Sequence, residues 1–386
     1  MEVRVLPGAP TIRKGGIIRR RICLGLAVGL VLGMLRLATA APVPGPALTA
    51  RNAELIAHVP LNYDSSGGRI VGKKFYLTTS RDFRIYDIAT PEAPVLLGSI
   101  PLVQEPQFSE EDLDTNGKIA LVESLGTLNV IDVSVPTAPS IMATLATSDY
   151  HTVSCVLGCR YAYTSTGIIL DLTDPRRPHL VGNWMKGTGV SDSHDVTEVK
   201  PGLIVSSSMP ILLLDARKDP IHPKVLARGS TADGRFIHAN RWPRRTQDRF
   251  LLAGGETLGP DCDAQDAGAF MTWDASRWRR GSFKMIDEYR VTNGLPSDGA
   301  WPYGQLCAHW FTEHPTFRNG GLVAMAWYES GVRFLRVSAK GAIGEIGHLI
   351  APGSVASAAY WVTDRLVYVL DYVRGFDVIR FTGPLR

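Results

Sequence analysis

The sequence lacks the excess of basic residues on which nucleic-acid-binding proteins depend. Its formal net charge is +4 at pH 7, but the first 40 residues hold seven Lys or Arg and one acidic residue. The rest of the chain has 34 basic and 36 acidic residues. Because nucleic acids and anionic membrane surfaces are bound through basic patches, we expect neither as the main partner.

A run of apolar residues long enough to span a membrane is also missing near the N-terminus. The run Ile22–Leu35 has 14 residues, short of the roughly 20 that a spanning helix needs. It follows a basic stretch and precedes "LATA", which is typical of a secretory signal peptide cleaved after Ala40. A retained anchor is the alternative, and "RRRIC" loosely resembles a twin-arginine export signal. We therefore expect residues 1–40 to be a signal peptide, 41–51 a Pro/Ala-rich linker, and the mature protein to be secreted or held in the cell envelope without a membrane span.

Cysteine is scarce, with five residues in the whole chain. One of them lies in the apolar run, so four remain after export to an oxidising compartment, where pairing is favoured. Cys155 and Cys159 bracket a turn in "SCVLGCRYAY", where a disulfide would staple a hairpin. That leaves Cys262 to pair with Cys307. Free thiols, or thiolate ligands for a metal, are the alternative interpretation.

Helical periodicity of useful length is absent, which together with 38 glycines and 25 prolines indicates an all-β chain. The chain has instead a degenerate internal repeat. Its clearest copies are "FYLTTSRDFRIYDIATPEAPVLLGSIPL", "IALVESLGTLNVIDVSVPTAPSIMATLA" and "YAYTSTGIILDLTDPRRPHLVGNWM". Each copy has a short β-rich run, a turn, a second run that ends in Asp, a proline corner and a third run.

The residue that ends the second run marks the register of the repeat. The seven markers are Asp87, Asp132, Asp171, Asp215, Asp274, Arg336 and Arg380. They are separated by 45, 39, 44, 59, 62 and 44 residues, the period of propeller blades with insertions around the fifth and sixth units. The seventh unit lacks its outer strand, and residues 53–61, "AELIAHVPL", match the outer strand "PVLLGSIPL". We predict one seven-bladed β-propeller over residues 52–386, closed by an N-terminal strand that completes the last blade.

The repeat resembles that of the LVIVD-repeat β-propellers, through the runs "LNVIDVS" and "IILDLTD". This resemblance covers nearly all of the chain after the predicted signal peptide and implies the fold without an activity. A more distant likeness, through "AHW", "WYESGVRF" and the general layout, is to the selenium-binding protein and methanethiol oxidase propellers. Those proteins carry histidines near a central metal. This second likeness implies a copper-dependent oxidase of a small sulfur compound.

Four of the nine histidines precede the first visible strand of four consecutive blades. They are His151, His194, His238 and His309. Because the innermost strand of every blade faces the central channel, we expect these side chains to converge on the propeller axis. Converging imidazoles suit a transition metal, copper ahead of zinc or iron. Asp195 and Glu313 adjoin two of these histidines and are candidates to orient a ring. The other histidines fall on the periphery of the repeat, at His58, His179, His222, His314 and His348.

Two classes of function fit this pattern. The first is a metal-dependent propeller that acts on a small extracellular molecule, and the second is a non-catalytic secreted binding or scaffold module. Channel histidines that bond only to water and carbonyl groups, or that form a protonated pocket for an anion or organic ligand, are the alternatives to a metal site. No "GxSxG" motif is present. We expect a monomer whose partner is a small molecule or an extracellular protein.

Overall fold

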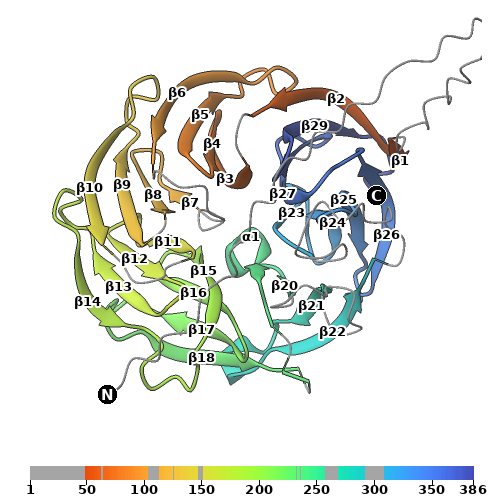
Figure 1. The fold of residues 1–386 in the computed structure, drawn as a ribbon. Coiled ribbons are helices and arrows are strands. Elements are labelled where there is room, and N and C mark those ends of the chain that lie inside the picture. The colour runs from red at the N-terminus through yellow and green to blue at the C-terminus, as the bar shows by residue number, and fades with distance from the viewer. Residues whose placement is uncertain are drawn as a thin grey trace, which may run out of the picture. The chain divides into compact units, whose positions relative to one another are not determined.

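The computed structural model describes residues 48–61, 64–102, 113–124, 126–146, 151–231, 233–234, 236–256, 268–291 and 308–386. The predicted signal peptide and the Cys262–Cys307 pair lie outside these residues. Within them, seven small antiparallel sheets form a ring (Figure 1). The predicted seven-bladed β-propeller is therefore confirmed.

Each blade runs outward from a strand at the channel to a strand at the rim (Figure 1). Blade one consists of β3 (Ser65–Val71), β4 (Lys74–Thr79), β5 (Asp82–Asp87) and β6 (Val95–Pro101). Blade two consists of β7 (Leu113–Thr115), β8 (Ile119–Ser124), β9 (Thr127–Asp132) and β10 (Ser140–Ala146). Blade three consists of β11 (Val153–Val156), β12 (Tyr161–Thr164), β13 (Ile168–Asp171) and β14 (His179–Asn183). Blade four consists of β15 (Ser193–Lys200), β16 (Leu203–Ser208), β17 (Ile211–Asp215) and β18 (Lys224–Gly229).

The last three blades carry the insertions and the ring closure. Blade five consists of β19 (Ala239–Arg241), β20 (Phe250–Gly254), β21 (Phe270–Asp274) and β22 (Lys284–Tyr289). Blade six consists of β23 (Phe311–Glu313), β24 (Gly321–Ala326), β25 (Val332–Val337) and β26 (Ile343–Ile350), with β1 (Thr49–Arg51) added outside β26. Blade seven consists of β27 (Ala356–Trp361), β28 (Leu366–Asp371), β29 (Gly375–Phe381) and β2 (Ala53–Pro60).

Both faces of each blade pack against a neighbouring blade. This explains why middle strands such as β16 and β28 are buried at every position and why they read as continuous apolar or small-residue runs. Seven hydrophobic clusters lie between the blades, one at each junction. The ring therefore has no single central core. Its stability comes from side-by-side packing of the blades, which leaves the axis available for polar side chains.

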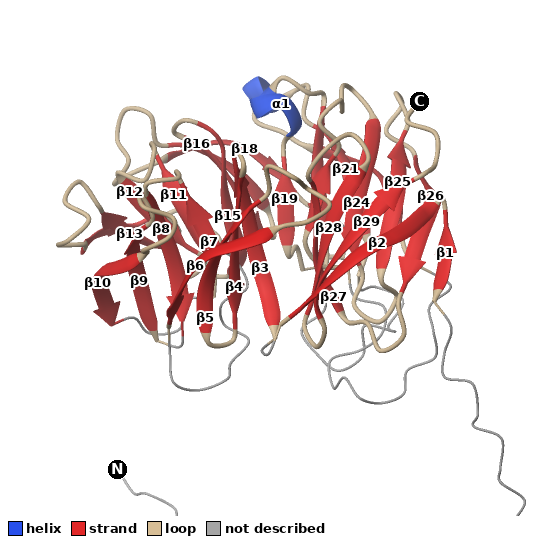
Figure 2. Ribbon diagram, turned by 90° about the horizontal axis from the view of Figure 1, so that it is seen from above, coloured by secondary structure: helices blue, strands red, loops and turns tan. Residues whose placement is uncertain are grey.

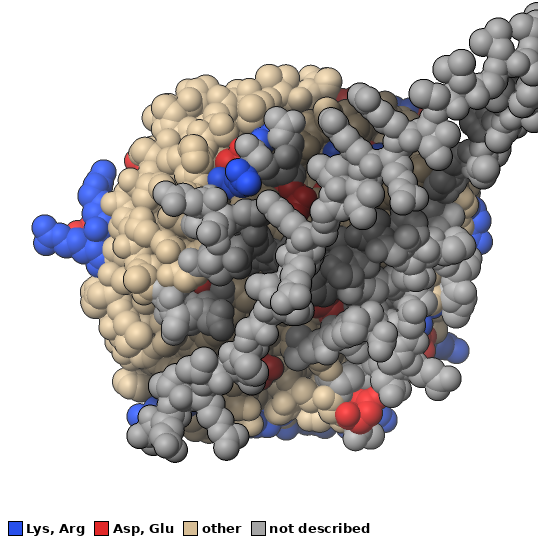
Figure 3. Space-filling view, in the orientation of Figure 1, with Lys and Arg blue, Asp and Glu red and all other residues tan. Residues whose placement is uncertain are grey.

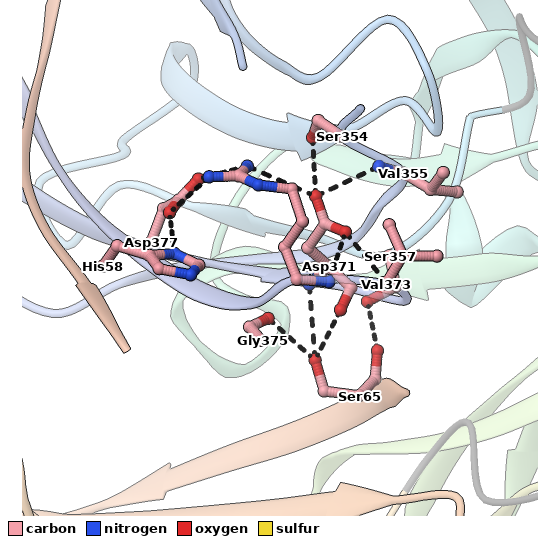
Figure 4. Close-up of polar contacts among 10 residues, drawn as sticks. His58, Ser65, Ser354, Val355, Ser357, Asp371, Val373, Gly375 and Asp377 are labelled. Atoms are coloured by element: carbon pink, nitrogen blue, oxygen red, sulfur yellow. Dashed lines mark hydrogen bonds and ion pairs between the residues drawn. The ribbon is translucent and has the colours of Figure 1, made fainter. Parts of the chain in front are cut away.

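The ring closes as the sequence predicts, because β2 pairs with β29 from Ala53 opposite Phe381 to Pro60 opposite Gly375. The pairing of β1 with β26 was not predicted. Polar contacts reinforce the closure (Figure 4): the His58 Nδ1 lies 2.7 Å from Asp377 Oδ1, and the Ser65 hydroxyl lies 3.0 Å from the Gly375 carbonyl oxygen. The first and last segments of the chain are thus joined to one another.

Two short helical segments interrupt the strands, α1 (Pro243–Thr246) after β19 and η1 (Trp278–Arg280) after β21. Figure 2 places α1 at one face of the ring. The predicted hairpin staple is present as a disulfide between Cys155 and Cys159 at the turn between β11 and β12. Among the described residues, no helix has the length and apolar character that crossing a membrane demands. On the face in Figure 3, Lys and Arg project mainly from the periphery with Asp and Glu scattered among them.

Candidate functional site

The four predicted histidines all lie at the beginning of an innermost strand. His151 and His238 come just before β11 and β19, His194 is the second residue of β15, and His309 comes two residues before β23. These strands belong to four consecutive blades, and each is the innermost strand of its sheet (Figure 1). The same register in each repeat therefore brings side chains that are up to 158 residues apart in the sequence to one end of the channel.

The four imidazole rings form a continuous row. Ring centroids are 4.5 Å apart between His151 and His194, 3.8 Å between His194 and His238, and 4.2 Å between His238 and His309. His238 and His309 are fully buried and His194 is 7% exposed. Trp310 covers one side, with its ring 4.9 Å from that of His238. Such contact distances put several ring nitrogens within reach of a common ligand.

One acidic residue that was not predicted from the sequence, Glu256, lies beside the row of histidines. One ligand atom each from His194, His238 and Glu256 lie within 4.8 Å of one another, and Glu256 Oε2 is 3.6 Å from His238 Nε2. The Tyr328 hydroxyl donates a hydrogen bond to Glu256 Oε1, which fixes the carboxylate. Glu256 is the third residue of the acidic, glycine-rich insertion at 254–268, for which the other repeats have no equivalent. Its only sequence signal was its position two residues after a buried strand.

The surroundings also determine the tautomer of His309. Its Nδ1 lies at hydrogen-bond distance from the backbone carbonyl oxygen of Ser357. Because a carbonyl only accepts, Nδ1 carries the proton, and in the neutral ring Nε2 keeps the lone pair. A backbone contact of this kind is how proteins commonly orient an imidazole that binds a metal.

Asp195 and Glu313 do not orient the rings, contrary to the expectation from sequence. Asp195 accepts a hydrogen bond from the Thr197 hydroxyl at 2.7 Å, and Glu313 forms an ion pair with Arg241 at 2.9 Å. Burial raises the pKa of the Asp195 carboxyl to about 6, against the opposing effects of Thr197 and Arg69. Neighbours in the sequence of a strand point to opposite sides, so Asp195 did not have to contact the ring of His194. Glu313 lies four residues beyond His309, at the other end of β23.

The remaining histidines lie apart from the row. His179 and His222 are exposed, as expected for the rim. His348 is less exposed than expected, because its Nδ1 lies 2.9 Å from Glu345. His314 was expected on the periphery but is instead buried between Thr316 and the carbonyl oxygen of Asp364. The first two of these side chains therefore face solvent, and the last two have structural partners.

Comparison with known proteins leaves the family open. No model of a known protein family matches the chain. No curated protein matches it either. The resemblance to the LVIVD-repeat and methanethiol oxidase propellers, and export through residues 1–40, therefore stay predictions.

Proposed function

We propose that the row of histidines binds a transition-metal ion, with His194, His238 and Glu256 as the central ligands and His151 and His309 beside them. The observation that supports this is the convergence of two buried imidazoles and one carboxylate within 4.8 Å. Imidazole nitrogens and a carboxylate oxygen brought this close together can share one cation as a common ligand set. The chain would then be a metal-binding propeller that acts on a small molecule.

The donor set fits a borderline transition metal. Two or three imidazole nitrogens with one carboxylate oxygen suit Cu²⁺, Zn²⁺ or Fe²⁺, whereas Ca²⁺ takes six to eight oxygen ligands. When divalent metals compete for such a site, copper binds most tightly. A bound ion would supply Lewis acidity or redox capacity at the channel. The protein would hold the ion, orient His309 through Ser357 and hold Glu256 through Tyr328.

Metal content of the purified full-length chain tests the proposal. After incubation with one equivalent of Cu²⁺, Zn²⁺ or Fe²⁺ and desalting, we expect near-stoichiometric metal in the native protein. A His238→Ala/Glu256→Gln variant should lose nearly all of this bound metal. His222→Ala, whose side chain is 81% exposed at the rim, is the matched control and should retain the metal.

Absence of metal from the native protein under all three conditions would contradict the proposal. Equal retention by the double variant and the native protein would also contradict it. If copper is retained, small thiols are the first substrates to screen, on the strength of the distant likeness to methanethiol oxidases.

A further inference from the structure

The opposite ends of the innermost strands form a second concave site. A pocket of ≈ 410 Å³ lies at this end, a volume suited to a small organic molecule. Its walls come from β3, β7, β15, β19, β23 and the segment α1. The charged residues that line it are Arg69, Asp114, Glu198, Lys200, Arg241, Arg244, Arg245 and Glu313.

The acidic residues of the pocket already have partners within the protein. Asp114 lies 3.2 Å from Arg69, and Glu313 lies 2.9 Å from Arg241. Glu198 accepts hydrogen bonds from the backbone N–H groups of Leu157 and Gly202 at 2.7 and 2.8 Å. These contacts keep the carboxylates fixed in the walls. Arginines neutralise Asp114 and Glu313, whereas Glu198 is held by backbone N–H groups and keeps its negative charge.

Three basic residues of the same pocket are not neutralised in this way. Among the described residues, no carboxylate lies within ion-pair distance of Lys200, Arg244 or Arg245. The lining carries five basic and three acidic side chains, so the excess charge is positive. An anion that entered the pocket would be attracted to Lys200, Arg244 and Arg245.

The segment that presents two of these arginines has an unusual backbone. Arg244, Arg245 and Thr246 have φ values of 55°, 52° and 71°, a left-handed conformation that is unfavourable for residues other than glycine. The ends of this turn are held by Trp242, whose indole N–H donates to the Asp248 carbonyl oxygen at 2.9 Å. Strain that the surrounding structure maintains is typical of binding sites. Here it places Arg244 and Arg245 side by side at the pocket.

The pocket is separate from the histidine row. Between them lies a cavity of ≈ 20 Å³, whose walls include Arg241 from the pocket and Trp310 from the histidine end. A cavity of this size holds about one water molecule. Trp310 and this cavity therefore lie between a ligand in the pocket and the histidines.

We propose that this pocket, which we name the arginine pocket, binds a small molecule through a carboxylate or phosphate group. Arginine pairs of this kind recognise both groups through paired N–H donors. The fixed carboxylates elsewhere in the lining would disfavour a second anionic group on the ligand and favour a hydroxyl or amine. This inference does not depend on metal binding, because it uses different residues at the other end of the channel.

Isothermal titration calorimetry of the full chain tests the inference, with inorganic phosphate, succinate and glycerol phosphate as separate probes. We expect saturable binding of at least one probe that weakens as salt screens the arginines. An Arg244→Gln/Arg245→Gln variant should bind the probe at least about tenfold more weakly, as expected for the loss of two charge-assisted contacts. Arg277→Gln/Arg280→Gln removes the same charge from an exposed segment outside the pocket and should bind as the native chain does.

Circular dichroism and thermal unfolding establish that each variant is folded. Should the double variant fail to fold, Lys200→Gln, outside the strained turn, is the second variant and should also weaken binding. If a phosphate probe binds more tightly than succinate, the ligand carries a phosphate group. If succinate binds more tightly, the ligand is an organic acid. The inference is wrong if no probe saturates by about 10 mM, or if the pocket and control variants weaken binding equally. Binding should persist in His238→Ala/Glu256→Gln, which separates this result from the fate of the metal site.

Discussion

At the scale of single residues, the aspartates that mark the repeat act as turn caps. In the first five blades the marker carboxylate accepts a hydrogen bond from the backbone N–H two residues later, at 2.7–3.1 Å. The pKa of each of these carboxyls lies below its usual range. For Asp132 the main causes are the hydroxyl and the N–H of Ser134. The pattern that identified the repeat is thus a turn with its own physical reason.

Ser134→Ala should therefore raise the pKa of Asp132 toward its ordinary value, because the carboxylate loses its hydroxyl donor at 2.5 Å. The native contact stabilises the fold above the unfolded pKa of about 3.9 and is lost as the pH falls through the folded value. Between about pH 4 and pH 2, the variant should consequently lose less unfolding free energy than the native chain does. Carboxyl NMR titration measures the pKa directly. Thr137→Ala on the same corner is the control, and an unchanged Asp132 pKa in Ser134→Ala would contradict the prediction.

At the scale of elements, the closing strand β2 joins two ends of the chain that lie more than 300 residues apart. Its side chains pack into two clusters, with Leu55 at the junction of blades six and seven and Val59 at the junction of blades seven and one. Without β2, the edge of β29 would expose its unpaired backbone groups. The strand is therefore needed both for packing and for protection of an edge.

Deletion of residues 1–60 should lower the unfolding midpoint and cause aggregation, whereas deletion of residues 1–47 should leave the midpoint unchanged. The two variants differ in the presence of β1 and β2. Thermal unfolding and size-exclusion chromatography measure the effect. A peptide of residues 48–61 added to the shorter chain should restore part of the midpoint, since it can pair with β29. Equal stability of the two truncated chains would show that β2 is dispensable.

The elements also show what sequence could predict and what it could not. The second and third strands are mostly buried runs such as β16 and β28, and the fourth strands at the rim have five to eight residues, so these runs were visible in the repeat. Innermost strands such as β7, β19 and β23 have only three residues, too few for a periodic signal, and were located only by register. Glu256 was missed because it follows a strand in an insertion that no other blade shares. The turn at Arg244 and Arg245 was missed because it contains no glycine, the residue that usually occupies left-handed backbone positions.

At the scale of the whole molecule, the histidine row connects blades three to six. Each of these blades contacts its neighbours through separate hydrophobic clusters, so a ligand held by several blades links packing units that otherwise interact pairwise. A metal that binds only the folded ring adds its binding free energy to the stability of the ring. At a free metal concentration of 100 times the dissociation constant, this amounts to about 2.7 kcal/mol.

Metal should therefore raise the unfolding midpoint of the native chain, and a chelator should reverse the increase. His238→Ala should lack the increase, but a loss of stability alone could obscure it. Phe75→Ala provides the matched control, because Phe75 is fully buried between blades seven and one, away from the histidine row. Loss of its ring should lower the free energy of unfolding by about 3–5 kcal/mol. The increase in unfolding midpoint caused by the metal should remain.

Differential scanning calorimetry with and without metal measures all three chains. An equal increase in the native chain and in His238→Ala would place the stabilising metal elsewhere. An increase that Phe75→Ala also loses would show that the metal responds to the general stability of the ring. An increase shared by the native chain and Phe75→Ala, and absent from His238→Ala, is expected only if the channel histidines hold the ion, because only that site requires blades three to six to keep their places around the axis.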